Sequence, residues 1–271
     1  MPLSNPIRRA AVVLHGRPDA VGSGVARLDS VAKAHGVELV VVEGDTDVTR
    51  LEVEIAVVLG GDGTMLRSLH RFLGTGIPVI GVNFGRVGFL SSIPRDELER
   101  GIARVFSGEF EVVELATLDV EADGRRFVAV NDAVVTSGEL GRMVELEWSL
   151  GDENFGRVPC DGLICSTPSG STAYNLSNGG PVLMWGLDAM ALTFVAPHDL
   201  RARPFVVPRG RDLLVWNRTA DVSCAVLVDG HRIADAGAGA RVSIRLGEGR
   251  SLLGTLPDVT FVRRYRQSFA P

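Results

Sequence analysis

A glycine-rich turn with a single carboxylate follows the third apolar run of the chain. It reads Gly60-Gly61-Asp62-Gly63-Thr64 and comes directly after the apolar residues 55–59. Glycines at a turn from a strand into a helix let a ligand reach the backbone, and the N–H groups at the start of the helix suit phosphate oxygens. The turn therefore predicts a phosphate-binding loop.

Asp62 is the unusual member of this turn, because a carboxylate among phosphate-binding amides repels a phosphate. It must therefore either hold a metal ion that bridges phosphates or face an acceptor hydroxyl as a general base. The alternative is a plain turn in which Asp62 or Thr64 caps the helix. Arg67, one helical turn later, either meets a phosphate or is a solvated helix residue.

A long uncharged polar run follows Asp161. Residues 163–181 contain hydroxyls, amides, glycines and one tyrosine, but no charged side chain. This composition suits a neutral polar ligand such as ribose, adenine or a carboxamide. The alternative is a capped helix that begins at Ser169 or Ser171 and ends at residues 179–180.

Two further loops carry polar residues. Asn131-Asp132 follows an alternating segment, and residues 83–90, which include Phe84, follow the fourth apolar run. Loops at the carboxyl ends of parallel strands are where α/β folds bind ligands. Taken alone, each loop is more typical of ordinary turn chemistry.

The elements that must position these residues begin with an α/β pattern. Continuous β-branched runs predict buried parallel strands, and the amphipathic segments between them predict helices. The expected strands are residues 11–14, 37–42, 55–59 and 78–82. The expected helices are residues 21–35, 64–73 and 94–106, the last capped by Ser92 and ended by Gly108. This half predicts a doubly wound, Rossmann-like α/β domain with a parallel sheet.

After about residue 111 the pattern changes to short alternating segments separated by turn signals. The expected strands are residues 118–121, 126–130, 144–150, 212–216, 222–228 and 241–246. Asp123-Gly124 and Asp229-Gly230 are typical hairpin turns. This half predicts a mostly antiparallel β domain, and no low-complexity linker separates it from the first.

The composition excludes several classes of function. The 271 residues are 45% hydrophobic with a formal net charge of −5, which argues against a nucleic acid or an anionic membrane as the main partner. Lys33 is the single lysine among 28 basic residues and falls on the polar side of an expected helix, so no lysine-dependent phosphate loop is present. The three cysteines lack metal-ligand spacing and indicate buried thiols in a reducing cytoplasm.

Four segments together resemble the signature set of the bacterial NAD kinases, in order and in spacing. They are the turn at residues 60–64, Asn131-Asp132, the run from Asp161 to Pro181, and residues 197–204. The resemblance covers about residues 55–232, and the stretch at residues 167–174 is highly specific. The glycine-aspartate turn alone is shared with phosphofructokinases and lipid kinases.

The resemblance implies an enzyme that transfers the γ-phosphoryl group of ATP, or a phosphoryl group of polyphosphate, to the adenosine 2′-hydroxyl of NAD. A divalent ion, Mg²⁺ or Mn²⁺, would bind with ATP, and no protein metal ligand is assigned. The implied organisation is an α/β domain over residues 1–112, a β-rich NAD-binding domain over 113–255, and a final segment, 256–271, that returns to the first domain. A cytoplasmic homodimer or homotetramer without nucleic-acid or membrane partners is expected.

On the phosphate side, the resemblance makes Asp62 the base near the 2′-hydroxyl. The other residues expected to bind ATP or NAD on this side are Gly61, Gly63, Thr64, Arg67 and Phe84. Near the C-terminus, Arg263, Arg264 and Arg266 are expected to form a solvated surface, with a phosphate-steering role as the alternative.

On the NAD side, Asn131 and Asp132 would hold ribose hydroxyls, and Asp229 would add a polar contact. Asp161 would reach the nicotinamide side of NAD bound to a neighbouring subunit. The residues expected to meet the nucleoside parts of NAD are Thr172, Ala173, Tyr174 and Ser177.

The chain departs from the family pattern at two positions. Many members have glutamate where this chain has Asp132, and arginine where it has Pro159. These departures support one rival interpretation, a nucleotide-binding regulator that has lost catalysis. The other rival is a lipid kinase, which would need an apolar or basic membrane-facing element that the sequence does not show.

Overall fold

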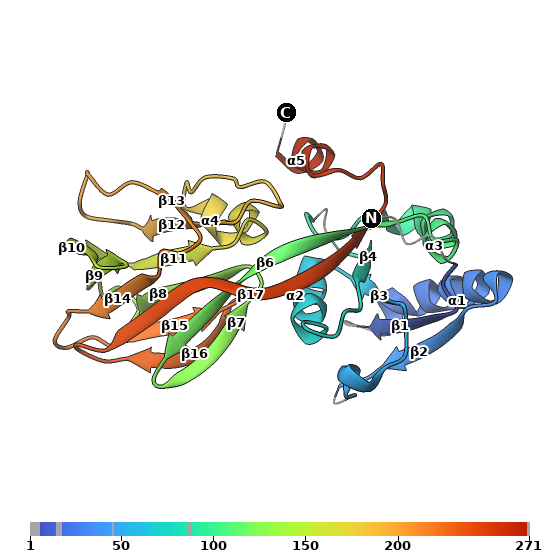
Figure 1. The fold of residues 1–271 in the computed structure, drawn as a ribbon, viewed down its shortest axis with the longest axis horizontal. Helices are drawn as coiled ribbons and strands as arrows, with labels where there is room; N and C mark the ends of the chain where they lie inside the picture. Colours follow the sequence, from blue (N-terminus) through green and yellow to red (C-terminus); the bar gives the residue numbers. More distant parts are fainter. Residues whose placement is uncertain (1–5, 15–17, 45, 86–87, 270–271) are drawn as a thin grey trace. The chain divides into compact units, whose positions relative to one another are not determined.

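The computed structural model describes residues 6–14, 18–44, 46–85 and 88–269. Its contacts divide the chain into two compact units: unit 1 comprises Met1–Glu114 and Ser251–Pro271, and unit 2 comprises Leu115–Arg250. Two long strands pass from one unit to the other, β6 (Glu111–Ala122) and β17 (Arg241–Thr255) (Figure 1). Within the described ranges, no helix is both long and apolar enough to cross a lipid bilayer.

Unit 1 is built on a parallel sheet with the strand order β4-β3-β1-β2. The strands are β1 (Arg9–Leu14), β2 (Glu38–Val42), β3 (Ile55–Gly60) and β4 (Val79–Asn83). In this register Val12 lies opposite both Val41 and Val57. Every residue of β3 is buried, which explains why its sequence is an uninterrupted apolar run.

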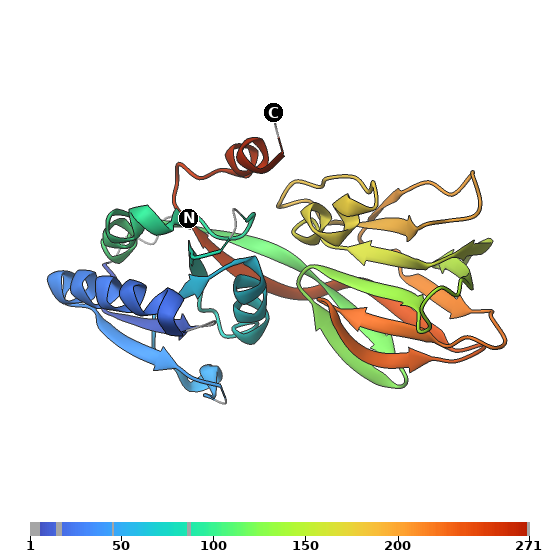
Figure 2. The same cartoon turned by 180° about the vertical axis from the view of Figure 1, so that it is seen from behind.

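Helices cover both faces of this sheet (Figure 2). Leu28 of α1 (Pro18–His35) and Ile102 of α3 (Leu98–Phe106) pack with Ile80 in one hydrophobic core. Neighbouring residues of a strand point to opposite faces, and Gly81 faces α2 (Asp62–Arg71), where a Cβ would lie 2.5 Å from the sulfur of Met65. The doubly wound α/β arrangement is therefore confirmed.

The helix expected from residue 94 begins later than the sequence predicts. Pro94 ends the short strand β5 (Ile93–Pro94) in extended backbone and precedes the 3₁₀ turn η2 (Arg95–Glu97). No side chain caps either η2 or α3. Ser92 is buried ahead of these turns, so the predicted Ser92 cap is wrong. The remaining elements of unit 1 are η1 (Val48–Arg50) and α5 (Phe261–Phe269).

Unit 2 consists of antiparallel strands. One sheet has the order β10-β9-β14-β17 with the β6–β7 hairpin on β17, and the other has the order β13-β12-β11-β8-β15-β16. The strands not yet bounded are β7 (Arg125–Ala129), β8 (Asp132–Ser137), β9 (Val144–Leu150), β10 (Glu153–Cys160), β11 (Gly162–Ser166), β12 (Ala189–Val195), β13 (Phe205–Pro208), β14 (Leu213–Asn217), β15 (Cys224–Val228) and β16 (His231–Ala236).

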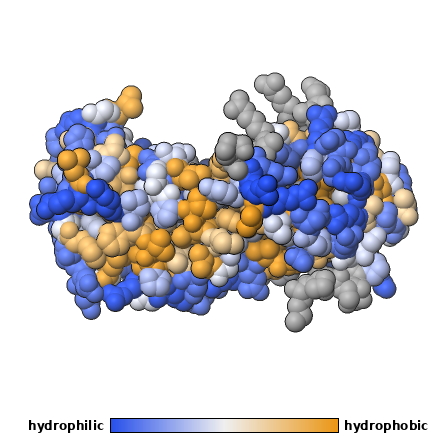
Figure 3. Space-filling view, turned by 90° about the horizontal axis from the view of Figure 1, so that it is seen from above, coloured by the Kyte–Doolittle hydropathy of each residue, from blue (hydrophilic) through white to orange (hydrophobic). Residues whose placement is uncertain are grey.

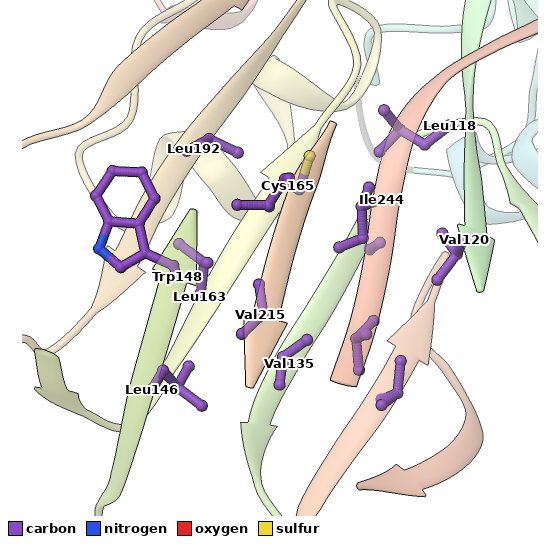
Figure 4. Close-up of a cluster of buried hydrophobic side chains, with 14 of the residues drawn as sticks. Leu118, Val120, Val135, Leu146, Trp148, Leu163, Cys165, Leu192, Val215 and Ile244 are labelled. Carbon is purple, nitrogen blue, oxygen red and sulfur yellow. The ribbon is translucent and has the colours of Figure 1, made fainter. Parts of the chain in front are cut away.

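The core of unit 2 is made by side chains from both of these sheets. Figure 4 shows Trp148 and Val215 of one sheet with Leu163 and Val135 of the other, and all four belong to one buried cluster. The three cysteines are free and buried, as the sequence predicts. The predicted mostly antiparallel β character of this half is confirmed.

Both predicted aspartate-glycine hairpin turns are present. Asp123 and Gly124 have φ values of 50° and 67°, and Asp229 and Gly230 have 48° and 79°. Consecutive positive φ angles are the geometry of a type I′ turn, which matches the twist of antiparallel strands. The second of these turns places Asp229 next to the Asn131-Asp132 loop.

Candidate active site

The glycine-rich turn of unit 1 joins β3 to α2. Gly61 caps α2 with extended backbone, and its carbonyl accepts a hydrogen bond from the Thr64 amide at 2.9 Å. A Cβ on Gly85 would lie 3.3 Å from the Cα of Gly61, so two glycine backbones approach each other here. The first amides of a helix have no intrahelical acceptor, so the N–H groups after Gly61 suit an anion.

The carboxylate of Asp62 is held by the loop that follows β4. The Phe89 amide donates to its Oδ2 at 2.5 Å, and the Leu90 amide lies 3.2 Å from both carboxylate oxygens. A Cβ on Gly88 would lie 2.1 Å from Oδ1 of Asp62, so any other residue there would displace the carboxylate. No side-chain hydrogen bond caps α2, so the alternative in which Asp62 or Thr64 caps the helix is wrong.

Arg67 and Phe84 both lie close to this turn, and the Phe84 amide donates to the Gly60 carbonyl at 3.0 Å. A Cβ on Gly63 would lie 3.9 Å from Nη1 of Arg67, which places an exposed guanidinium beside the start of α2. The guanidinium of Arg95 lies over the ring of the half-buried Phe84, 5.2 Å from the ring centroid. Residues 86–87 of the loop expected to bind a ligand lie outside the described residues.

In unit 2, Asp229 organises the Asn131-Asp132 loop. Its carboxylate accepts hydrogen bonds from the amides of Val130, Asn131 and Asp132 at 2.9, 2.7 and 3.2 Å. The Asp229 amide in turn donates to the carbonyl of Asp132 at 3.0 Å. The expected residues Asn131, Asp132 and Asp229 are therefore brought together, with the Asp229 carboxylate directed at backbone amides.

Unpaired polar atoms gather at this loop. Asn131 Oδ1, Ser166 Oγ and Ser169 Oγ are buried and find no hydrogen-bond partner within the described part of the chain. Ser166 lies directly opposite Asp132 in the β11–β8 register, so their side chains share a face of the sheet. Buried polar groups are normally paired, so such a cluster indicates a place for a polar ligand or water.

Burial perturbs the carboxyl group of Asp132. Its residue is only 6% exposed, and desolvation, assisted by the nearby negative charge of Asp229, raises its pKa from 3.8 to about 7. A carboxyl group with this pKa is divided between its neutral and charged forms at neutral pH. It can therefore donate as well as accept a hydrogen bond to a sugar hydroxyl.

Many polar side chains of the hydroxyl-rich run at residues 163–181 form hydrogen bonds within the protein. Asn175 donates to the carbonyls of Ser171 and Pro181 and accepts from Thr193 Oγ1 at 2.7 Å, and Thr167 Oγ1 donates to the carbonyl of Val130. The run forms only two short turns, η3 (Gly170–Thr172) and α4 (Tyr174–Ser177), without a side-chain cap, so the capped-helix alternative is wrong. The predicted ligand residues are the less buried members: Thr172, Ala173, Tyr174 and Ser177.

Gly170 fixes the distance between this run and the Asn131 backbone. A Cβ there would lie 2.0 Å from the Asn131 carbonyl oxygen, which is backbone and cannot rotate away. We expect Gly170→Ala to cost about 1 to 3 kcal/mol of unfolding free energy, as overpacking does. Thermal or urea unfolding measures this, with Gly44→Ala as the control, because nothing lies within 4 Å of a Cβ at Gly44. Equal stabilities of the two variants would contradict the described close approach.

Asp161 is not brought together with the other predicted NAD-side residues. It precedes β11, whereas Ser166, opposite Asp132, ends that strand. Five residues of strand span about 16 Å. The Asp161 side chain is exposed, and its carbonyl accepts from the Ser137 amide at 2.9 Å.

One predicted solvated residue is buried. Arg263 is exposed and pairs with Asp258, but Arg264 is only 2% exposed. Its guanidinium donates to the carbonyls of Phe89 and Ser91 at 2.8 and 3.1 Å. The expectation of a solvated cluster is therefore wrong for Arg264. It lies on the inner side of the amphipathic helix α5, which cannot be inferred from an arginine in isolation.

Comparisons with known proteins decide the family. The N-terminal domain model of ATP-NAD kinases matches residues 31–110, and the C-terminal domain model matches residues 130–253. An NAD kinase from Gemmatimonas aurantiaca is 36% identical over 230 residues, covering 83% of this chain and 80% of that protein. An NAD kinase from Heliobacterium modesticaldum is 37% identical over 221 residues, covering 80% and 78%.

The chain belongs to the NAD kinase family. Two solved structures share its fold. An NAD kinase from Archaeoglobus fulgidus in complex with ATP has a TM-score of 0.76 at 26% identity, covering 96% of this chain and 97% of that chain. Yeast NADH kinase complexed with NADH has a TM-score of 0.82 at 21% identity, covering 97% and 88%. The resemblance expected from the motifs is confirmed, and these matches do not favour the lipid kinase or the weakened regulator.

Membership of the NAD kinase family does not by itself explain why Asp62 and the Asn131-Asp132 loop hold their positions. In this structure the Phe89 and Leu90 amides bind the Asp62 carboxylate, and Arg264 donates to the Phe89 carbonyl. The Asp229 carboxylate binds the amides of the Asn131-Asp132 loop. Only Asp229 carried a sequence signal, the aspartate-glycine turn. The amides at residues 89–90 are backbone groups, and Arg264 is an arginine that the sequence predicts to be solvated.

Proposed function

We propose that the protein transfers the γ-phosphoryl group of ATP to the adenosine 2′-hydroxyl of NAD and so forms NADP. The observation that carries this proposal is the Asp62 carboxylate at a glycine turn with helix-start amides, in a chain of the NAD kinase family. A phosphate turn alone needs no carboxylate. A reaction in which a hydroxyl attacks a phosphate does, because the hydroxyl must lose its proton.

In this proposal Asp62 accepts the proton of the 2′-hydroxyl, and the amides after Gly61, with Gly63, Thr64 and Arg67, line the phosphate turn. Phe84 adds a ring beside it. The unpaired polar atoms of Asn131, Ser166 and Ser169 support the assignment of ribose contacts to the loop of unit 2. The exposed or half-buried residues Thr172, Ala173, Tyr174 and Ser177 are proposed to meet the nucleoside parts of NAD.

A divalent ion, Mg²⁺ or Mn²⁺, is proposed to enter with ATP. Across the described ranges, no group of three or more His, Cys, Asp or Glu side chains is placed to hold an ion. Mg²⁺ is commonly held mainly by substrate phosphates, so we assign its ligands to ATP, with Asp62 as the one carboxylate in the turn. When bound, the ion would neutralise charge on the phosphates.

A coupled assay for NADP tests the proposed function. The purified protein, with Mg²⁺, should form NADP from NAD and ATP, and parallel reactions with NADH and with polyphosphate would define the acceptor and the donor. Diacylglycerol as acceptor tests the lipid kinase alternative. Absence of NADP with every donor and acceptor, from a folded protein, would refute the proposal.

We also propose that the enzyme is a cytoplasmic homodimer or homotetramer. Its three free thiols suit a reducing compartment. Large hydrophobic side chains on unit 2, among them Leu200 at 90% and Val206 at 50% exposure, offer surface for association. Figure 3 shows hydrophobic residues interspersed with hydrophilic ones on one face of the molecule.

Subunit mixing tests whether Asp161 serves a neighbouring subunit. We expect Asp161→Ala and Asp62→Asn to be nearly inactive alone. In a randomly mixed dimer about a quarter of the sites would be intact, so part of the activity should return. Light scattering must confirm the assembly and subunit exchange must be verified. A mixture that stays inactive, or an active monomer, would contradict the proposal.

A further inference from the structure

A single peptide group lies between a buried cation and the carboxylate of Asp62. In the peptide group that joins Phe89 to Leu90, the Phe89 carbonyl oxygen accepts a hydrogen bond from Arg264 Nη1 at 2.8 Å. The N–H of this group, on the Leu90 side, lies 3.2 Å from the Asp62 oxygens. Hydrogen bonds in such a chain polarise one another, so the guanidinium strengthens the hydrogen bond from the Leu90 amide to the Asp62 carboxylate.

Arg264 also binds a second carbonyl of this segment and a hydroxyl of β17. Nη1 also donates to the Ser91 carbonyl at 3.1 Å, and Nη2 donates to Thr255 Oγ1 at 2.7 Å. The Phe89 and Ser91 carbonyls and the Thr255 hydroxyl are neutral hydrogen-bond acceptors. Burial lowers the pKa of Arg264 to about 10, and the charge of Asp62 opposes this, so the guanidinium stays protonated at neutral pH.

Aromatic residues of the same helix also pack against the ring of Phe89. The Phe89 ring packs edge-on against Phe261 with centroids 5.1 Å apart and stacks on Phe269 with centroids 6.1 Å apart. Helix α5 therefore contacts both the ring and the carbonyl of Phe89. The amides that orient Asp62 take their own position from α5.

We propose that Arg264 is a positioning residue for Asp62, acting through the Phe89–Leu90 peptide group. In the proposed reaction, the hydroxyl proton passes to the Asp62 carboxylate as the hydroxyl oxygen bonds to the γ-phosphorus and the bond from phosphorus to ADP breaks. Arg264 touches neither substrate in this step. It keeps the carboxylate oriented toward the hydroxyl, and this assignment rests on the proposed function.

Arg264→Met tests the inference, because methionine keeps an apolar stem and removes the charge and donors. We expect kcat to fall about 10- to 100-fold, the scale on which a misplaced group slows a reaction, with the KM values for NAD and ATP within about 2-fold. Arg264→Lys should recover part of the loss. Arg263→Met on the exposed side of the same helix is the control, and its kcat should not change.

A double-mutant cycle separates positioning from a general structural role. In an Asp62→Asn background there is no carboxylate to orient, so Arg264→Met should lower the residual kcat by less than about 2-fold. A structural role would give the same fractional loss in both backgrounds, and that result would overturn the inference.

If the methionine variant does not fold, Arg264→Lys carries the same cycle. A lysine cannot hold both carbonyls as a planar guanidinium does, so a folded lysine variant with unchanged kcat would also overturn the inference. An inactive wild-type protein would instead refute the proposed function. An active wild type with unaffected Arg264 variants refutes this inference alone.

Discussion

Asp62→Asn should lower kcat at least about 100-fold, because a general base contributes roughly 10² to 10⁴ to a rate. Phosphoryl transfer passes through a loose transition state, so positioning and a divalent ion supply most of the acceleration and the base supplies the remainder. The structure adds a reason of its own. The Phe89 and Leu90 amides hold a carboxylate, and asparagine offers them one acceptor oxygen in place of two.

The fold of this variant should survive. Losing one acceptor at two amides costs about 1 to 3 kcal/mol, which circular dichroism and thermal unfolding would detect, while the KM for NAD should stay within a few-fold. Asp96→Asn, at an exposed position of unit 1, is the control. Recovery of activity at high Mg²⁺ or Mn²⁺ would make Asp62 a metal-site residue, and barely reduced activity would make the turn purely structural.

The sequence predicts β1, β3 and β4 well because most residues of these strands are buried on both faces of the sheet. The apolar run at residues 55–59 and the observed β3 differ by one residue, Gly60, and the helix after the turn follows from the same periodicity. The orientation of Asp62 could not be predicted. It depends on amides 27 and 28 residues away in the chain, and backbone amides carry no sequence signal.

In unit 2 the sequence locates the polar loop but not its chemistry. Asn131, Asp132 and Asp229 are predicted to act together, and the structure joins them by hydrogen bonds. The burial of Asp132 depends on pairing between β8 and β11, which are separated by a hairpin of other strands in the chain. The perturbed pKa of Asp132 is therefore a property of the fold that composition and spacing do not show.

Asp132→Asn should stabilise the protein in a pH-dependent way. The folded-state pKa of Asp132 is raised from 3.8 to about 7, so between these values the native state binds a proton that the unfolded state releases. The stability that this proton contributes is complete at acidic pH and is lost as pH rises through about 7. Each pH unit in this window is worth about 1.4 kcal/mol, so the wild type should lose about 3 kcal/mol relative to the asparagine variant between pH 5 and pH 8.

Urea unfolding of both proteins at pH 5 and at pH 8, without nucleotide, measures this difference directly. Other titrating groups are common to the two proteins, so they cancel in the comparison. Asp152→Asn, at an exposed position, is the control and should follow the wild type at both pH values. If Asp132→Asn also follows the wild type, the carboxyl group is not desolvated and the ribose hydroxyls would meet an ordinary carboxylate. If the gap opens with pH, the loop instead offers NAD a group that both donates and accepts near neutrality, because its proton is retained by burial and by Asp229.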